Sequence, residues 1–136
     1  MADVLTPEQR RRCMAAIRGR NTKPEMIVRS LAHRMGYRFR LHRKDLPGRP
    51  DLVFSGRRKV IFVHGCFWHR HPRCRYATTP VTRPEFWKNK LDGNRERDLR
   101  VQRELRKIGW EVLVVWECQT RDLERLEQRL RAYLDG

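Results

Sequence analysis

The stretch PDLVFSGRRKVIFVH, residues 50–64, decides the fold because it joins two apolar runs through a short polar turn. The run DLVF (51–54) predicts one strand, and KVIFVH (59–64) predicts another that is apolar enough to be buried on both faces. The connection SGRR (55–58) is short enough for the two strands to pair as a hairpin. The chain therefore contains a sheet with at least one strand covered on both sides.

The segments before this hairpin predict a third strand and two helices. Apolar residues alternate with arginines over 37–41, as in a half-buried strand, so the three strands form a meander. Over 22–36 apolar residues recur at helical period, and Thr22 and Glu25 have the spacing of a capping box. A further helix is expected over 6–19.

The second half of the chain predicts a long loop and more helices. No period survives over 65–81, and an ordered loop of this length needs a specific reason. The expected elements after it are a short helix that opens at Thr82, a longer helix between Gly93 and Gly109, a strand over 110–116 and a helix over 122–134. The order of elements predicts one α/β domain over 1–136, a mixed sheet flanked by helices.

The charge of the chain predicts a polyanionic partner. Of 136 residues, 32 are Lys or Arg and 16 are Asp or Glu, which gives a net charge of +16. The excess lies mainly in residues 1–75, which hold 19 basic and 5 acidic residues. Solubility alone needs far less charge, and the many arginines favour bidentate phosphate contacts, so nucleic acid is the expected partner. The sequence has no apolar run of the kind found in membrane spans or signal peptides, which predicts a cytoplasmic protein that binds no membrane.

The stretch HGCFWHRHPRC (64–74) predicts a structural metal site. Three N or S ligands lie within nine residues, and a fourth follows the last strand; they are Cys66, His71, Cys74 and Cys118. If the strands over 59–64 and 110–116 lie side by side, Cys66 and Cys118 each come two residues after a strand end. Such ligands suit tetrahedral Zn²⁺, although His69 or His64 could take the place of His71. Cys13, on an apolar helix face, is expected to be a core residue.

A second group of residues has the composition of a phosphodiester hydrolysis site. Asp51 opens a strand after a sharp turn, and His64 ends the next strand, five residues before His69. An aspartate that opens a strand is also a common turn residue, so Asp51 alone is weak evidence. However, a carboxylate that holds Mg²⁺, a neutral imidazole and basic residues for phosphate are the groups that such hydrolysis needs.

Two acidic residues have both a structural and a functional interpretation. Glu25 is explained as the capping-box partner of Thr22, and it could also orient water beside the metal. Asp98 is either a solvated surface acid or the residue that fixes the tautomer of His69. The aromatic pair Phe67-Trp68 is expected to point outward from the basic loop and to wedge between base steps of DNA.

Together these residues resemble the very short patch repair endonucleases, bacterial enzymes that nick DNA at T:G mismatches. The resemblance covers nearly the whole chain, and HGCFWH (64–69) is its most specific block. The other matching blocks are MADV (1–4) with Met14, LPGRPDLVF (46–54), VIFVHGCFWHRHPRC (60–74), TRPEFW (82–87), NRERD (94–98) and GWEVLVVWEC (109–118). The resemblance implies a restriction-endonuclease-like fold with a structural zinc site.

The resemblance also implies a role for each matching position. Asp51 and the backbone carbonyl of Val63 would hold Mg²⁺, and His69 would be the general base, oriented by Asp98. His64 and Glu25 would assist around the metal and the scissile phosphate. The zinc ligands would be Cys66, His71, Cys74 and Cys118, and the residues that contact DNA would be Phe67, Trp68, Trp87, Met14, Lys90 and Asn94.

By this resemblance the protein is expected to be a Mg²⁺-dependent nickase that cleaves 5′ of the mismatched thymine. Its partner would be double-stranded DNA with a T:G mismatch, contacted by an N-terminal helix (1–20) beside a zinc-stapled loop (65–81). A monomer bound at the nucleoid, with other mismatch-repair proteins as partners, is also implied. Two alternatives stay open: a related nuclease with a different target, and a zinc-stapled DNA-binding protein without catalysis. Val63 departs from the family, which often has threonine there.

Overall fold

The computed structural model describes residues 22–136. The helix expected over 6–19 lies outside the described residues, together with Cys13 and Met14. The described elements are α2 (Lys23–Arg34), β1 (Arg40–Leu41), β2 (Leu52–Phe54), β3 (Lys59–His64), α3 (Pro84–Lys107), β4 (Glu111–Trp116) and α4 (Leu123–Asp135), with short 3-10 turns at Ser55–Arg57 and Glu117–Arg121.

The four strands form one mixed sheet in the order β1-β2-β3-β4. The first three strands are antiparallel neighbours, which confirms the meander, and β3 pairs in parallel with β4. β1 is shorter than the strand expected over 37–41: it has two residues, which pair with Leu52 and Val53 of β2. His64 lies opposite Trp116 at the last pair of the parallel register, so both central strands end at the same edge of the sheet.

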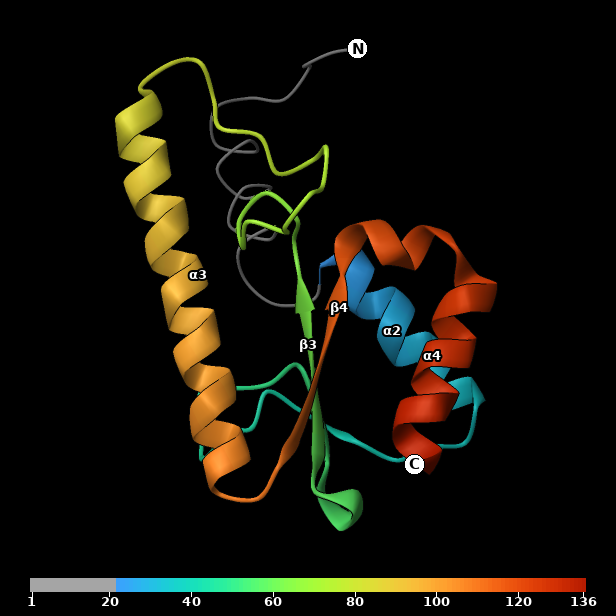
Figure 1. The fold of residues 1–136 in the computed structure, drawn as a ribbon. Helices are drawn as coiled ribbons and strands as arrows, with labels where there is room; N and C mark the ends of the chain where they lie inside the picture. The colour runs from blue at the N-terminus through green and yellow to red at the C-terminus, as the bar shows by residue number, and fades with distance from the viewer. Residues whose placement is uncertain (1–21) are drawn as a thin grey trace, which may run out of the picture.

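Helices cover both faces of the sheet, with α2 and α4 on one side and α3 on the other (Figure 1). Alternate residues of β3 point to opposite faces, so Ile61 packs with α2 and α4, whereas Val60 and Phe62 pack with α3. Each such side chain contributes roughly 1.5–3 kcal/mol when it is fully buried. The prediction that this strand is buried on both faces is therefore confirmed.

The segment after the long loop differs from the expectation of two helices. α3 is one continuous helix of 24 residues that passes through Gly93. A glycine inside a helix costs only about 1 kcal/mol relative to alanine, so it weakens a helix without necessarily ending it. Leu91 and Leu105 are fully buried on either side of the glycine, and their packing holds the two halves in one helix.

The starts of α2 and α3 differ in how well they agree with the expected positions. Thr22 caps α2, since its side chain accepts a hydrogen bond from the amide of Glu25, as expected. The start expected at Thr82 was wrong, because α3 begins at Pro84 and its N-cap is Arg83, which makes no side-chain cap. Among residues 22–136, no helix has both the length and the apolar character that a membrane span requires.

Candidate active site and metal centre

The ends of β2 and β3 and the first turn of α2 surround a cleft of about 470 Å³. Asp51 precedes β2, His64 ends β3, and Glu25 lies in the first turn of α2, so the sheet topology brings three distant segments to one edge. His69 and Asp98 also line the cleft, from the loop after β3 and from α3. The five catalytic residues expected from the sequence therefore lie around one cavity.

Asp51 is held against the backbone of the neighbouring strand. Its Oδ2 atom accepts a hydrogen bond of 2.6 Å from the amide of Val63. Burial raises the pKa of Asp51 to about 7, although the Val63 amide acts in the opposite direction. A partly buried carboxylate with a raised pKa is costly to ionise without a cation beside it. The recorded contact with Val63 uses the amide, and the ligand role expected of its carbonyl stays a prediction.

His42 also belongs to the site, and the sequence analysis missed it. Its Nε2 atom lies 2.8 Å from Oε2 of Glu25 and 3.4 Å from Oδ1 of Asp51. Glu25 is buried, and its carboxylate forms an ion pair with Arg29, whereas the helix cap at Thr22 uses its backbone amide. A signal for His42 did exist, because a meander that pairs Leu41 with Leu52 also brings the next residues, His42 and Asp51, close together.

His69 and Asp98 form the pair that the sequence predicted. Nδ1 of His69 lies 2.6 Å from Oδ2 of Asp98, within hydrogen-bond distance. A proton on Nδ1 leaves Nε2 of the ring free to accept one. The ring stacks on His64, with the two centroids 4.0 Å apart and the planes 7° from parallel. Burial lowers the pKa of His64 well below its ordinary value, so that ring is neutral.

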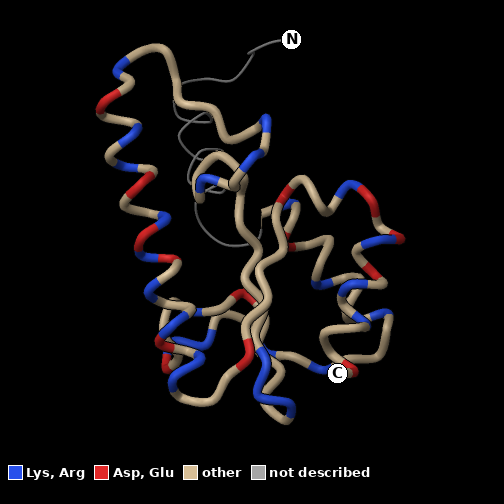
Figure 2. Tube along the Cα trace, viewed as in Figure 1, with Lys and Arg blue, Asp and Glu red and all other residues tan. Residues whose placement is uncertain are grey.

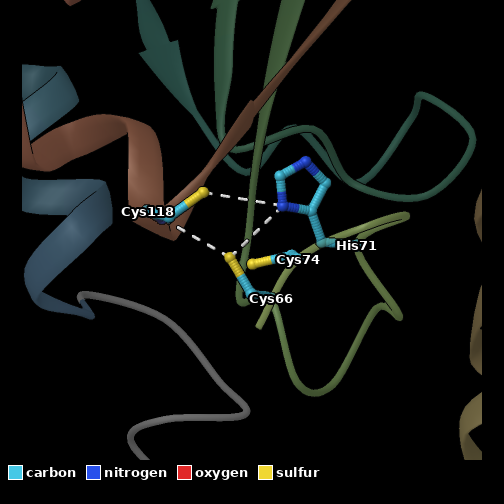
Figure 3. A group of neighbouring side chains, drawn as sticks. All are labelled: Cys66, His71, Cys74 and Cys118. Carbon is cyan, nitrogen blue, oxygen red and sulfur yellow. Dashed lines mark hydrogen bonds between the residues drawn. The ribbon is translucent and has the colours of Figure 1, made fainter. Parts of the chain in front are cut away.

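The four residues proposed as zinc ligands come together at the adjacent end of the sheet (Figure 3). Nδ1 of His71 lies 3.6 Å from Sγ of Cys66 and 3.5 Å from Sγ of Cys118, and each of the four offers a ligand atom within 4.8 Å of the others. The expectation that Cys66 and Cys118 follow adjacent strand ends is confirmed by the pairing of His64 with Trp116. His71, rather than His69 or His64, completes this cluster.

The chemistry of this donor set fits Zn²⁺. Three sulfur atoms and one imidazole nitrogen form one of the common tetrahedral zinc sets. Burial raises the pKa of the Cys66 thiol to about 12, whereas the amide of Cys118 donates to its sulfur and favours the thiolate. A cation between the four ligands would offset the cost of ionising buried thiols.

The aromatic residues of the loop are arranged differently from the expectation. Trp68 does not point outward: its exposed fraction is 8%, and its carbonyl accepts a hydrogen bond from Asn94 of α3. Phe67 is half-buried, and the rings of Phe67, Trp68 and Trp87 pack together with centroids 5.0–5.9 Å apart. The cause is α3, because its Trp87 packs on the ring of Trp68. The sequence alone did not indicate this contact between the helix and the loop.

The candidate DNA-contacting residues of α3 lie on one face of the helix. Trp87, Lys90 and Asn94 are spaced by three and four residues, which places them one above the other. The loop over 65–83 carries four arginines and no acidic residue (Figure 2). An aromatic cluster with basic residues around it is the composition of a nucleic-acid contact surface.

Three comparisons place these features in a protein family. A family model described as DNA mismatch endonuclease Vsr matches residues 2–75. The type II nicking enzyme V.XorIIP of Xanthomonas oryzae pv. oryzae is 56% identical, over 99% of this chain and 98% of that protein. The DNA mismatch endonuclease Vsr of Escherichia coli K12 is 47% identical, over 100% of this chain and 90% of that protein. This chain therefore belongs to the DNA mismatch endonuclease Vsr family.

Proposed function

We propose that the protein is a strand-specific nickase that acts at T:G mismatches and cleaves 5′ of the mismatched thymine. As a member of the Vsr family the chain is a DNA endonuclease, and therefore a hydrolase. The names of its relatives, which are a mismatch endonuclease and nicking enzymes, support nicking. The T:G target rests on the resemblance of the matching sequence blocks, such as HGCFWH (64–69), to the very short patch repair endonucleases.

One observation carries the proposal. The hydrogen bond between His69 and Asp98 orients an imidazole in the same cleft as the carboxylate of Asp51. A base that is oriented by a carboxylate, beside a site for a divalent cation, is the arrangement that hydrolyses phosphodiesters. A protein that only bound DNA would need neither group in that geometry.

The side chains then divide the reaction between them. His69 takes the proton of the attacking water at Nε2, and Asp98 stabilises the imidazolium that forms. His64 is neutral and stacked on His69, so it keeps that ring in place without competing for the proton. Lys23, Arg49 and Arg97 line the cleft and supply positive charge for the scissile phosphate.

The residues at Asp51 fit a divalent cation. Glu25 and Asp51 each offer a carboxylate oxygen to a group of possible ligand atoms that lie within 4.8 Å of one another. Carboxylate oxygens are ligands that Mg²⁺ prefers. When bound there, Mg²⁺ would stabilise the charge that develops on the leaving 3′ oxygen. Oδ1 of Asp51 would hold the cation, because Oδ2 already accepts from the Val63 amide. The Val63 carbonyl is the second ligand that we propose.

Zn²⁺ is proposed for the cluster of Cys66, His71, Cys74 and Cys118, where it would have a structural role. The cluster links the loop after β3 to the turn after β4. The same loop carries His69, so the zinc site would fix the position of the general base.

The DNA contacts are proposed from the packed aromatic cluster. Phe67 and Trp87, the partly exposed members of the cluster, would separate the mismatched pair from its neighbours, with Trp68 packed behind them as support. Lys90 and Asn94 would contact the pair. Met14, which lies outside the described residues, is proposed to contact the minor groove. A monomer acting in the cytoplasm would suffice, because one nick needs one active site.

A second candidate is a nickase that reads a different site. This candidate is favoured by the printed names of several relatives, including V.XorIIP and the V.NmeAIP of Neisseria meningitidis, which is 39% identical over 100% of this chain. Both candidates share the chemistry of the cleft and differ only in the DNA that is cut.

The catalytic assignment is tested with Asp51→Ala and His69→Ala. Each variant should lower nicking of a T:G duplex by roughly 10²–10⁴-fold, the usual effect of losing a catalytic group, while still binding the duplex. His33→Ala, on the exposed side of α2, is the matched control. Wild-type nicking rates in both active-site variants would refute the assignment.

A further inference from the structure

His42 lies beside two carboxylates, the buried one of Glu25 in the first turn of α2 and the partly buried one of Asp51 just before β2. Its Nε2 atom is 2.8 Å from Glu25 and 3.4 Å from Asp51, and each of the three residues offers a ligand atom within 4.8 Å of the others. The pairing of Leu41 with Leu52 in the β1–β2 ladder fixes this position, because His42 and Asp51 are the next residues beyond the last pair.

The imidazole of His42 lies among the ligand atoms of this group but forms no aligned hydrogen bond there. Nε2 of His42 has no exposed surface, and within the described residues it makes no hydrogen bond, although it lies near two carboxylates. A ring nitrogen placed to pair with one carboxylate would direct its N–H bond at an oxygen of that carboxylate. The ligands of a cation instead converge on a common centre. A cation bound there would therefore explain why Nε2 of His42 is buried without a hydrogen-bond partner among residues 22–136.

A simple counter-ion role accounts less well for the geometry. Glu25 already has a cationic partner in Arg29, and Asp51 already accepts a hydrogen bond from Val63.

The nitrogen ligand bears on the choice of cation. Mg²⁺ is bound almost entirely through oxygen, from carboxylates and water. Imidazole favours first-row transition ions, and carboxylates are good ligands for Mn²⁺ as well as for Mg²⁺. A site with two carboxylates and one imidazole is thus matched to Mn²⁺ or a similar transition ion.

We propose that His42 is a third ligand of the catalytic cation site, with Glu25 and Asp51, and that its imidazole makes the site prefer Mn²⁺ to Mg²⁺. The inference rests on the proposed function, because it refines the cation site on which nicking depends. It adds a ligand and a cation preference that the motif around Asp51 does not contain.

The test measures cation binding directly on the full-length, zinc-loaded protein. Mn²⁺ binding is followed by the loss of the free-ion signal in electron paramagnetic resonance, and Mg²⁺ by competition. His42→Gln should weaken Mn²⁺ binding by about tenfold or more, with a clearly smaller effect on Mg²⁺. His33→Gln, an exposed histidine on α2, should change neither. Equal effects of His42→Gln on the two cations would overturn the proposal.

A spectroscopic readout keeps the inference falsifiable if the variant folds poorly. Pulsed resonance on wild-type protein with bound Mn²⁺ should show coupling to one imidazole nitrogen, which changes when histidine is labelled with ¹⁵N. Wild-type protein without nitrogen coupling would refute the proposal, and so would coupling that survives in folded His42→Gln, since His64 or His69 would then be the source.

The two proposals can fail separately. If wild-type protein nicks T:G duplexes with Mg²⁺ but shows no nitrogen coupling to Mn²⁺, the His42 inference is wrong and the proposed function stands. If wild-type protein shows the coupling and the cation preference but nicks no DNA, the cation site stands and the proposed function is wrong.

Discussion

At the scale of single residues, the cleft holds titratable groups in contrasting environments. Partial burial raises the pKa of Asp51 to about 7, whereas His64 is kept neutral by its own burial. His69 is less buried and is oriented by Asp98. Groups whose environments differ in this way can take different roles in one reaction at one pH.

The raised pKa of Asp51 has a consequence for stability. The pKa of Asp51 is about 7 in the folded protein and near 3.8 when unfolded, so folding becomes less favourable as pH rises from about 4 to 7. Asp51→Asn removes this penalty. In zinc-loaded protein without added Mg²⁺ or Mn²⁺, we expect the variant to gain about 2 kcal/mol more unfolding free energy at pH 8 than at pH 5.

Urea denaturation at the two pH values measures this difference. Asp92→Asn, at an exposed position of α3, is the control and should show no such pH dependence. An equal effect of Asp51→Asn at pH 5 and pH 8 would show that the carboxylate is not strained by burial.

At the scale of elements, local sequence signals predicted much of the fold. The capping pair at Thr22, the alternation in β3 and the helical period of α4 each determined the element correctly. Features that depend on contacts between distant segments were not predictable in this way. Gly93 is expected from the sequence to separate two helices, but buried leucines on both sides keep α3 continuous.

The residues of the candidate site likewise fall into those that local sequence predicts and those that depend on contacts between distant segments. The four residues proposed as zinc ligands and the pair His69–Asp98 were predicted because their residue types and spacing carry the chemistry. His42 was missed because its place depends on the register between β1 and β2. The orientation of Trp68 was wrong because it is set by packing against α3.

The continuity of α3 gives a prediction about Gly93. An added Cβ at this position meets no atom within 4 Å, so alanine fits without a clash. Gly93→Ala should therefore raise the unfolding free energy by about 0.5–1 kcal/mol through helix propensity. Thermal denaturation measures the gain. A loss of stability would mean that the helix is kinked or broken at residue 93, as the sequence first indicated.

At the scale of the whole molecule, the catalytic cleft and the proposed zinc cluster lie at the same edge of the sheet. The loop after β3 carries both His69 and three of the proposed zinc ligands, so one segment connects the two centres (Figure 1). The net charge of +16 gives the chain as a whole a field that attracts DNA.

Removal of zinc should therefore abolish nicking even when Mg²⁺ is in excess. Without the cation, the loop over 65–81 loses its main cross-link to Cys118, and His69 is no longer held beside Asp51. Hydrogen exchange should show loss of protection confined mainly to this loop. A zinc-stripped protein that keeps full nicking activity would contradict the structural role of the cluster.

The charge predicts strongly salt-dependent binding to DNA. Displacement of counterions by arginine and lysine should weaken binding by at least about tenfold between 50 and 200 mM salt. Fluorescence anisotropy with the Asp51→Ala variant measures binding without cleavage. An affinity that does not change with salt would argue against phosphate contacts as the main source of binding.

The central claim is tested most directly by strand-specific cleavage of duplexes that are identical except for T:G or C:G at one position. The flanking bases are randomised, and zinc-loaded protein is used with and without Mg²⁺. We predict a single nick 5′ of the mismatched thymine, only in T:G duplexes and only with the divalent cation. Cleavage of C:G duplexes, or of both strands, would contradict the account.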